Sequence, residues 1–316
     1  MNNQWTITDI PPQTGKRVLI TGANSGIGYH AALVLMRKGA QVILACRDEQ
    51  RGKDALARLN AAVPDARAEL AILDLASLES VRQFARKELA SQRHIHILVN
   101  NAGVMAPPKR LETADGFELQ FGTNVLGHFA LTALLMPALR LAAADSPDRP
   151  RIVTIASIAH KHGRIDFDDL QSRKTYSPMQ SYRQSKLADL MFAFELDRRL
   201  RAANSRVMSV AAHPGVANTN LFRAGDRSAI SAVARELLGH VIGSLLNTDH
   251  AGALPTLYAA TSPDVSDGGY YGPQGFLEAR GSRIGEANVA RQAKDASIAG
   301  RLWQACEELT QVDFRP

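Results

Sequence analysis

Short runs of apolar residues alternate with longer segments of helical periodicity over the first two-thirds of the chain. Because the apolar runs are nearly continuous rather than alternating, they are typical of parallel strands covered on both faces. We expect these strands at residues 16–21, 41–46, 68–74, 95–100, 151–156 and 206–213. The helical patterns between them lie at about 26–38, 49–60, 78–90, 116–141 and 181–201. Repeated strand–helix units predict an α/β fold, a single doubly wound Rossmann-type parallel sheet flanked by helices.

The periodicity weakens beyond residue 220. Residues 228–246 carry an apolar stripe typical of a helix, 250–261 predict another helix, and 268–276 predict a short strand and turn. Segment 221–247 is either a small lid over a hydrophobic substrate or a surface that packs on the domain or on a partner subunit. Nothing resembles an interdomain linker, so we expect an N-terminal tail at 1–14 and one domain at 15–316.

The composition is that of an ordinary globular protein, with 45% hydrophobic and 22% charged residues among 316. The only cysteines, Cys46 and Cys306, form no CxxC motif or Cys/His cluster, so we expect no metal site and a reducing, cytoplasmic location. Residues 1–17 lack the apolar core of a signal peptide. The most apolar stretch, 129–144, is too short to span a bilayer, so it predicts a buried helix rather than a stable membrane anchor.

The net charge is +6 and the pI is about 9.5, which would permit nucleic-acid binding. However, the basic residues are dispersed among acidic ones, without a basic tract or an aromatic stacking motif. We therefore expect no nucleic-acid partner, although a phosphate-rich small ligand would benefit from this charge.

The sequence TGANSGIG places a glycine-rich turn between a predicted strand and a predicted helix. Gly22 permits a sharp exit from the strand, whereas Gly26 and Gly28 permit close approach of a pyrophosphate and tight helix–strand packing. The helix N-terminus then offers free N–H groups to the phosphates. The spacing TGxxxGxG departs from GxGxxG, but its strand–turn–helix context favours nucleotide binding.

The second predicted strand ends in LACRDEQ, where a carboxylate would normally hold the adenosine ribose. Cys46 stands at that position and Arg47 follows it. A guanidinium can bind a 2′-phosphate through two hydrogen bonds, so we expect NADP(H) rather than NAD(H). The alternative is that Arg47 only ends the strand, while Asp48 holds the ribose or caps the next helix.

Tyr182 and Lys186 lie four residues apart on a predicted helix and therefore share one face. By itself this pair is better explained as part of a solvated surface, because Tyr and Lys are common and such spacings arise by chance. Tyr176 is a second tyrosine in the same region, but Gln180 rather than a lysine follows it by four residues. The choice depends on the other motifs of the chain.

Several motifs follow one another in a characteristic order: TGANSGIG, DLAS at 74–77, NNAG at 100–103, FGTNVLGHF around Asn124, Ser157, YRQSK, and HPGVANT at 213–219. In this order they resemble the short-chain dehydrogenase/reductase family from about Gly15 to the C-terminus. The segments ACRDEQRG, TADGFELQFGTNVLGHFALT and SIAHKHGRIDFDDL resemble its retinol-dehydrogenase branch, which includes the oxidoreductase domain of WW-domain-containing oxidoreductase.

The resemblance implies a catalytic set of Asn124, Ser157, Tyr182 and Lys186. A free tyrosine, with a pKa of about 10, is a poor base at neutral pH. An ammonium beside it and the charge of an oxidised nicotinamide would stabilise the phenolate, and moving a phenol to pH 7 takes roughly 4 kcal/mol. Ser157 would hold the substrate oxygen, Lys186 would also bind the nicotinamide ribose, and Asn124 would anchor a proton-relaying water. For Ser157 the alternative is a helix cap.

The resemblance also implies a set of cofactor contacts. Besides Tyr182 and Lys186, these are Gly22, Asn24, Ser25, Gly26, Ile27, Gly28, Arg47, Asp74, Leu75, Asn101, Ala102, Gly103, Pro214, Gly215, Val216 and Thr219. Asp74 is almost as well explained as the N-cap of the next helix. We interpret His128 as structural packing and His160 and His162 as loop histidines.

The expected activity is hydride transfer between NADP(H) and a small-molecule carbonyl or alcohol, a lipophilic or aromatic aldehyde, ketone or secondary alcohol. Substrate recognition is assigned to the segment between Ser157 and Tyr182 and to 221–247. The alternatives are a non-catalytic NADP(H)-binding redox sensor and a related reductase acting on a C=C bond. The resemblance further implies a homodimer or homotetramer assembled through helices 116–141 and 181–201.

Overall fold

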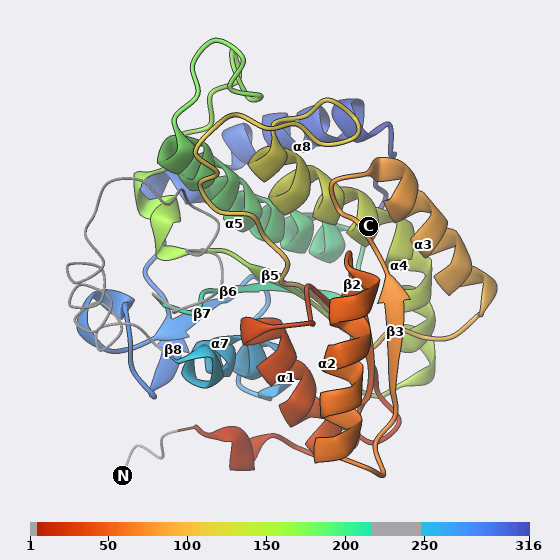
Figure 1. Ribbon diagram of the computed structural model, residues 1–316. Coiled ribbons are helices and arrows are strands. Elements are labelled where there is room, and N and C mark those ends of the chain that lie inside the picture. Colours follow the sequence, from red (N-terminus) through yellow and green to blue (C-terminus); the bar gives the residue numbers. More distant parts are fainter. Residues whose placement is uncertain (1–4, 216–247) are drawn as a thin grey trace, which may run out of the picture.

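The computed structural model describes residues 5–215 and 248–316. Its centre is one eight-stranded sheet with the strand order β3-β2-β1-β4-β5-β6-β7-β8 (Figure 1). The strands are β1 Arg17–Thr21, β2 Gln41–Cys46, β3 Ala68–Ile72, β4 Ile97–Asn100, β5 Arg151–Ile155, β6 Met208–Ala212, β7 Tyr270–Pro273 and β8 Ile284–Glu286. The pairs from β3 to β7 are parallel, and β8 is antiparallel to β7. The predicted α/β class and the six predicted strands are confirmed, whereas β8 was not predicted.

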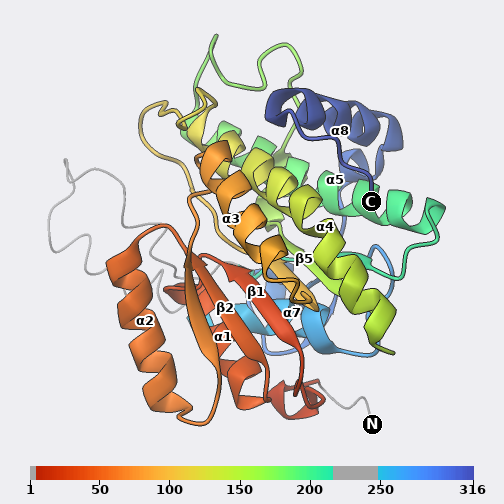
Figure 2. The same ribbon diagram turned by 90° about the vertical axis from the view of Figure 1, so that its right-hand side faces the viewer.

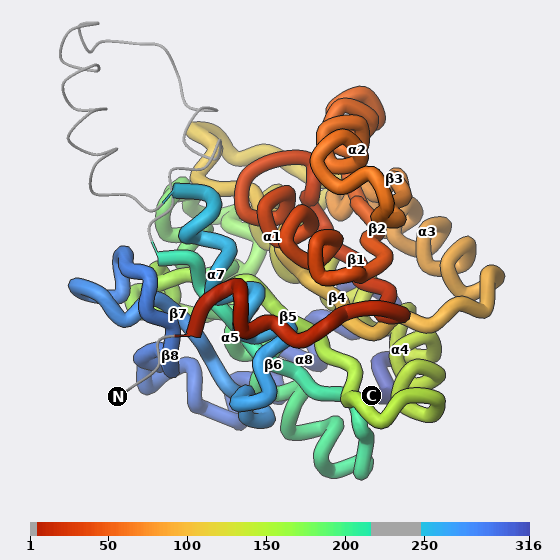
Figure 3. The backbone as a smooth tube through the Cα atoms, turned by 90° about the horizontal axis from the view of Figure 1, so that it is seen from below, coloured from red at the N-terminus to blue at the C-terminus, as the bar shows by residue number. Residues whose placement is uncertain are grey.

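The helices cover both faces of the sheet (Figure 2). Their bounds are α1 Gly26–Arg37, α2 Glu49–Ala62, α3 Leu78–Ala90, α4 Gly127–Asp145, α5 Pro178–Ala202, α7 Asp249–Thr261 and α8 Ala296–Thr310. Helices α1, α2 and α7 share one hydrophobic core with the sheet, and α3, α4, α5 and α8 share the other. Figure 3 shows α1 and α7 side by side on the face of the sheet that α1, α2 and α7 cover.

Strand β1 shows why its apolar run is continuous. Val18 and Ile20 enter the core under α1 and α7, while Leu19 between them enters the core under α4 and α5. Successive side chains of a strand point to opposite faces, so both must be apolar when helices cover both faces. Strand β1 ends at Thr21, so the glycine-rich turn that follows it lies at the carboxyl edge of the sheet.

The predicted helix at 116–141 begins later and ends later than expected. A π-helical turn, η2, spans Phe121–Leu126 and leads into α4. Residues 121–145 form the one helix of the described chain that is long and apolar enough to cross a membrane. Of its most apolar window, 72% is buried inside the fold, as expected for a core helix.

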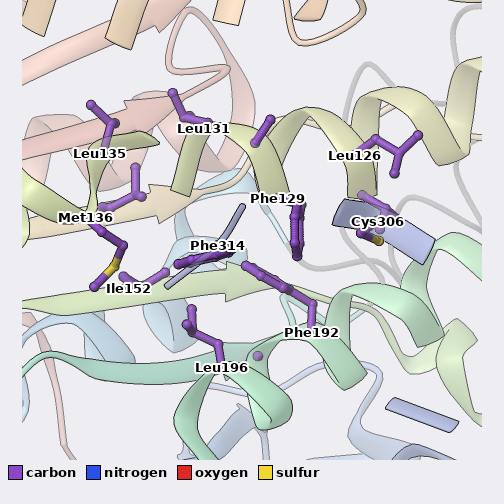
Figure 4. Packing of buried hydrophobic residues seen from close by; sticks show 14 of the residues in the cluster. Leu126, Phe129, Leu131, Leu135, Met136, Ile152, Phe192, Leu196, Cys306 and Phe314 are labelled. Atoms are coloured by element: carbon purple, nitrogen blue, oxygen red, sulfur yellow. The ribbon is translucent and has the colours of Figure 1, made fainter. Parts of the chain in front are cut away.

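Phe129 of α4, Phe192 of α5 and Phe314 of the C-terminal segment lie together in the core (Figure 4), and Trp303 of α8 completes this aromatic cluster. Trp303 lies 5.0 Å from Phe129 of α4, 5.9 Å from Phe192 of α5 and 4.7 Å from Phe314, measured between ring centroids. These rings bury the faces of α4 and α5 that turn toward α8. Those faces are therefore not available for the subunit contact that the resemblance implies.

The N-terminal segment from Trp5 onward also packs on the rest of the fold. Trp5 packs edge-on against Tyr258 of α7, at a centroid distance of 5.2 Å, and Ile10 is buried. The helix predicted at 228–246 and the proposed lid at 221–247 lie outside the described residues.

Candidate active site

The glycine-rich turn connects β1 to α1 at the carboxyl edge of the sheet. Gly22 and Gly26 have φ angles of +67° and +58°, a conformation that side chains with a Cβ rarely adopt. A Cβ on Gly28 would lie 2.6 Å from Nδ2 of Asn101, so only glycine fits there. Ser25 is the N-cap of α1, but its side chain makes no capping hydrogen bond. Asn24 and the buried Ile27 complete the predicted turn.

The side chain of Thr21 connects this turn to the NNAG segment after β4. Its hydroxyl oxygen accepts hydrogen bonds from the backbone N–H groups of Asn101 and Ala102, both at 2.9 Å. The amide of Asn101 in turn donates to the Thr21 carbonyl at 2.7 Å. The two predicted cofactor-binding segments are thus one hydrogen-bonded unit.

These features fit a dinucleotide. The turn leads directly into a 12-residue helix, whose first N–H groups have no partner within the helix and can bind phosphate oxygens. Gly22, Gly26 and Gly28 would lie against the phosphates. Asn101, Ala102 and Gly103 follow β4 at the same edge of the sheet, next to the predicted ribose site.

The structure at the end of β2 decides one of the roles predicted for Asp48, which was either to hold the adenosine ribose or to cap the next helix. The Asp48 carboxylate accepts a hydrogen bond from the Arg51 backbone N–H at 2.9 Å and is the N-cap of α2. Arg47 is exposed at the strand end. Sequence reasoning missed Arg58, whose guanidinium donates to the Asn24 carbonyl at 3.3 Å and lies 4.6 Å from the Tyr29 ring centroid. Burial raises the pKa of the Cys46 thiol to about 11, so Cys46 supplies no charge here.

Asp74 follows β3 but does not cap α3, so the capping alternative is wrong. The N-cap is Ser77, whose hydroxyl accepts from the Ser80 N–H, whereas the Asp74 carboxylate accepts from the Ala76 N–H at 3.0 Å. The reason is spacing, because the turn at 74–77 places Ser77 immediately before the helix. Leu75 is buried against Gly127, and the adenine contacts of Asp74 and Leu75 stay predictions.

Lys186 lies buried on α5, one turn after Tyr182. Its ammonium donates to the Ile155 carbonyl of β5 at 2.9 Å and to the Asp189 carboxylate at 2.8 Å. A Cβ on Gly103 would be 3.8 Å from Nζ, so no side chain separates the ammonium from the predicted ribose segment. Burial lowers the pKa of Lys186, but Asp189 and Tyr182 outweigh it and raise the value, which keeps the ammonium charged.

Asn124 lies in the π-helical turn and binds two other parts of the site. Its Oδ1 accepts from the Val104 N–H at 2.8 Å, while Nδ2 donates to the Val104 carbonyl and to the Ser185 hydroxyl, both at 3.0 Å. Ser185 donates to the Tyr182 carbonyl at 2.9 Å. Asn124 therefore joins the segment after β4 to the helical turn that carries Tyr182, and π-helical turns are frequent at functional sites.

Ser157 follows β5 two residues after Ile155. Its hydroxyl accepts from the Ala159 N–H at 3.2 Å and begins a short 3-10 helix, η3 Ile158–His162. This is the helix-cap geometry given above as the alternative for Ser157. The side chain is also half-buried and lies where it is predicted to hold the substrate oxygen. The capping bond uses the hydroxyl as an acceptor only, which leaves its proton for a substrate oxygen.

His160 and His162 are not loop histidines, so this interpretation is wrong. Both lie in η3, and His160 is fully buried because its ring links two backbone segments. Its Nδ1 lies 2.7 Å from the Ser157 carbonyl, and its Nε2 accepts from the Ala290 N–H at 3.2 Å. His160 thereby ties the serine turn to the C-terminal part of the chain.

Tyr182 and Tyr176 lie in different surroundings. Tyr176 donates to the Pro107 carbonyl at 2.7 Å, and burial together with Glu118 raises its pKa to about 12, which disfavours proton exchange. Tyr182 is half-buried, and its hydroxyl has no hydrogen-bond partner among residues 5–215 and 248–316. It lies one helical turn before Lys186, and its role as proton donor stays a prediction.

His128 packs inside the fold, as predicted, and also makes specific bonds. Its Nδ1 lies 2.8 Å from the Asn124 carbonyl, and its Nε2 lies 2.9 Å from the Thr21 hydroxyl. Because a carbonyl only accepts, Nδ1 carries the proton. Burial lowers the pKa of His128 to about 4, so the ring is neutral and couples the glycine-rich turn to Asn124.

Beyond β6, the predicted contacts are only partly described. Pro214 and Gly215 leave the sheet at its carboxyl edge, and the Gly215 N–H donates to Nδ1 of His213 at 3.2 Å. Val216 and Thr219 lie outside the described residues. In the described part of the chain, no three His, Cys, Asp or Glu side chains are grouped so that they could hold a metal ion.

Taken together, a pyrophosphate-binding turn and a Tyr–Lys pair at the carboxyl edge of a doubly wound sheet define a nucleotide-dependent oxidoreductase. The family model for short chain dehydrogenases matches residues 16–228, and the chain belongs to that family, which uses NAD(P)(H). Polyprenol dehydrogenase of Mus musculus is 41% identical over 305 residues, which cover 95% of this chain and 85% of that protein.

Two further relatives give the same picture. Retinol dehydrogenase 13 of Homo sapiens is 39% identical over 305 residues, covering 95% of this chain and 86% of that protein. The crystal structure of an uncharacterized protein from Mycobacterium Paratuberculosis is 40% identical, has a TM-score of 0.79 and covers 99% of both chains. The expected resemblance to the retinol-dehydrogenase branch is thus confirmed.

Proposed function

We propose that the protein is an NADP(H)-preferring alcohol dehydrogenase and carbonyl reductase for lipophilic or aromatic substrates. The observation that carries this proposal is a set of hydrogen bonds that fixes Lys186 to the strand before Ser157 and Asn124 to the helical turn of Tyr182. Lys186 binds the end of β5 two residues before Ser157, and Asn124 binds the turn of α5 that contains Tyr182. Proton transfer to a carbonyl oxygen needs such a fixed donor beside a cation.

The roles of the side chains follow from their chemistry. When bound, NADP(H) supplies or accepts the hydride. The Tyr182 hydroxyl gives its proton to the substrate oxygen in reduction and takes it back in oxidation. The Ser157 hydroxyl donates a hydrogen bond to the same oxygen, and the Lys186 ammonium stabilises the tyrosinate that remains.

The preference for NADP(H) is supported by charge at the end of β2. Arg47 is exposed there, the Asp48 carboxylate is used to cap α2, and Arg58 adds a second cation at the Asn24 carbonyl. A 2′-phosphate would gain from both arginines, whereas a ribose hydroxyl would lack the usual carboxylate partner.

The choice of lipophilic substrates is supported by the relatives. Their names specify polyprenol and retinol, both apolar alcohols. The chain is about 40% identical to these proteins over nearly its full length. We extend the same substrate class to this protein.

The first test follows oxidation of NADPH and NADH with a panel of aldehydes and ketones, from short aliphatic to aromatic and isoprenoid compounds. We expect turnover with apolar carbonyls and its loss in Tyr182→Phe. Tyr176→Phe is the matched control, because it removes a tyrosine hydroxyl from the same region and should retain activity. Equal activity of wild type and Tyr182→Phe would contradict the proposal.

The second test addresses the cofactor. In Arg47→Gln, the ratio of kcat/KM with NADPH to that with NADH should fall by roughly 10- to 100-fold, because a charge-assisted phosphate contact is lost. Arg51→Gln is the control, since Arg51 is an exposed arginine one turn further along. An unchanged ratio in Arg47→Gln, or an equal fall in both variants, would refute the assignment of Arg47.

A further inference from the structure

Asp189 is a buried carboxylate that the roles above leave unexplained. Its side chain is 4% exposed and that of Lys186 is 7% exposed, and the two form an ion pair at 2.8 Å. They stand three residues apart on α5, on the face that packs into the core. A buried ion pair costs much desolvation and is weak evidence for stability, so its presence calls for another reason.

The geometry of the ammonium supplies that reason. A lysine ammonium has three N–H donors, and two of them bind the Ile155 carbonyl and the Asp189 carboxylate. With two directions fixed, the third N–H is also fixed. The open side of Nζ faces Gly103 and Asn124, where the predicted ribose segment lies.

Among residues 5–215 and 248–316, few other titratable groups act on this ion pair. Tyr182 interacts electrostatically with Lys186 from the same helix, His128 does so from α4, and Cys306 of α8 interacts electrostatically with Asp189. His128 is neutral and burial raises the pKa of the Cys306 thiol, so neither adds charge near pH 7. Burial raises the pKa of Asp189 to about 6 against the opposing effect of Lys186, which leaves the carboxylate ionised at neutral pH.

We propose that Asp189 is a positioning residue of the reaction: it orients the Lys186 ammonium and sets the pH at which the Lys186–Tyr182 pair exchanges its proton. This inference rests on the proposed function. The carboxylate stabilises the state in which both Lys186 and Tyr182 are protonated. It therefore delays loss of a proton from this pair to higher pH.

Replacing Asp189 by asparagine removes this stabilisation while keeping the size of the side chain. The pair then loses its proton at lower pH, whether the proton leaves the ammonium or the phenol, because both products have the same net charge. For loss of the phenol proton, a unit charge at roughly 10 Å, through an effective dielectric constant of about 20, moves the titration by about one pH unit, and loss of a proton from the nearer ammonium would be moved further in the same direction.

The experiment measures kcat/KM for oxidation of one alcohol as a function of pH in wild type, Asp189→Asn and Asp197→Asn. Asp197 is the matched control, because it is a buried carboxylate on the same helix that is paired with Arg201 rather than with Lys186. We expect the rising limb to move about one pH unit lower in Asp189→Asn only. Plateau kcat should fall by about tenfold, because the ammonium loses its fixed orientation.

Two results would overturn the proposal. One is a rising limb in Asp189→Asn within about 0.3 pH units of wild type, well under the expected shift. The other is an equal shift in Asp197→Asn. If Asp189→Asn does not fold, Asp189→Glu retains the charge and should keep the wild-type limb with a lower kcat; a displaced limb there would equally overturn it.

A measurement without turnover separates this inference from the proposed function. The ultraviolet absorbance of the phenolate, taken as wild type minus Tyr182→Phe, follows loss of the phenol proton of this pair in the protein without substrate. The same difference is then measured between Asp189→Asn and the double variant Asp189→Asn/Tyr182→Phe. If no alcohol is oxidised but the phenolate titration moves to lower pH in Asp189→Asn, the proposed function fails and the role of Asp189 stands. If the titration midpoint does not move, the role of Asp189 fails.

Discussion

Trp303 gives the most direct test of how the C-terminal helix supports the site. Its side chain is 2% exposed and lies between aromatic rings of α4, α5 and the C-terminal segment, with the Arg199 guanidinium 4.3 Å from its ring centroid. Replacing a buried tryptophan by alanine costs about 3–5 kcal/mol, because transfer free energy is lost and a cavity remains. A domain of this kind has a total stability of only about 5–15 kcal/mol.

Trp303→Phe makes this prediction sharper. The indole Nε1 of Trp303 is buried without a hydrogen-bond partner, so phenylalanine removes an unsatisfied donor as well as part of the ring. Regaining about 1–3 kcal/mol from that donor offsets much of the lost packing. We therefore expect Trp303→Ala to be strongly destabilised and Trp303→Phe to stay within about 1.5 kcal/mol of wild type.

The assay is urea unfolding followed by circular dichroism, since both variants remove the fluorescence of Trp303 and leave only that of Trp5. Trp5→Ala is the control, because Trp5 is the only other tryptophan and packs at the edge of α7. A Trp303→Ala variant within about 1 kcal/mol of wild type would refute the reasoning, since a filled aromatic core cannot lose an indole at so small a cost.

Three further predictions follow from buried groups. His128 and His213 have pKa values lowered by burial to about 4 and about 3, so the unfolded state binds more protons below pH 6.5. Stability should then fall as pH falls, by about 2 kcal/mol per histidine between pH 7.5 and 5; denaturant midpoints that do not change over this range would contradict this. A Cβ at Gly272 would overlap Nε2 of His213, so Gly272→Ala should lower the thermal midpoint, and an unchanged midpoint would show that this strand can move. Gly28→Ala should weaken NADPH binding by at least about tenfold, because its Cβ displaces the Asn101 amide. Calorimetric titration measures this affinity, and a wild-type Kd for NADPH in Gly28→Ala would contradict the prediction.

The sequence predicts the central strands well because helices cover both faces of the sheet. Each strand then becomes a continuous apolar run, which is a strong signal. The ends of the predicted helices are less accurate. Helix α5 begins at Pro178 instead of residue 181, because a proline is favourable in the first turn of a helix. The C-terminal elements were missed for different reasons. Strand β8 has three residues, too few for a pattern, whereas α8 carried signals that could have been used.

Helix α8 begins after Asp295, whose carboxylate accepts hydrogen bonds from the N–H groups of residues 297 and 298. Its apolar positions at 298, 299, 302, 303 and 306 have the spacing of one helix face. An N-cap followed by such a stripe predicts a helix. What the sequence could not show is the partner of this face, because the packing of α8 on α5 joins residues more than 100 positions apart.

The same limit applies to the active site. A motif specifies Tyr182 and Lys186 by their spacing, but Asp189 three residues later looks like half of an ordinary surface ion pair until its burial is known. We expect that burial to depend on α8, since the aromatic cluster around Trp303 holds α8 against α5 and the buried Cys306 of α8 lies within electrostatic reach of Asp189. The charge balance around the predicted proton donor is therefore set by the last 20 or so residues of the chain, and a loss of α8 packing should change the pH dependence of the reaction as well as the stability of the fold.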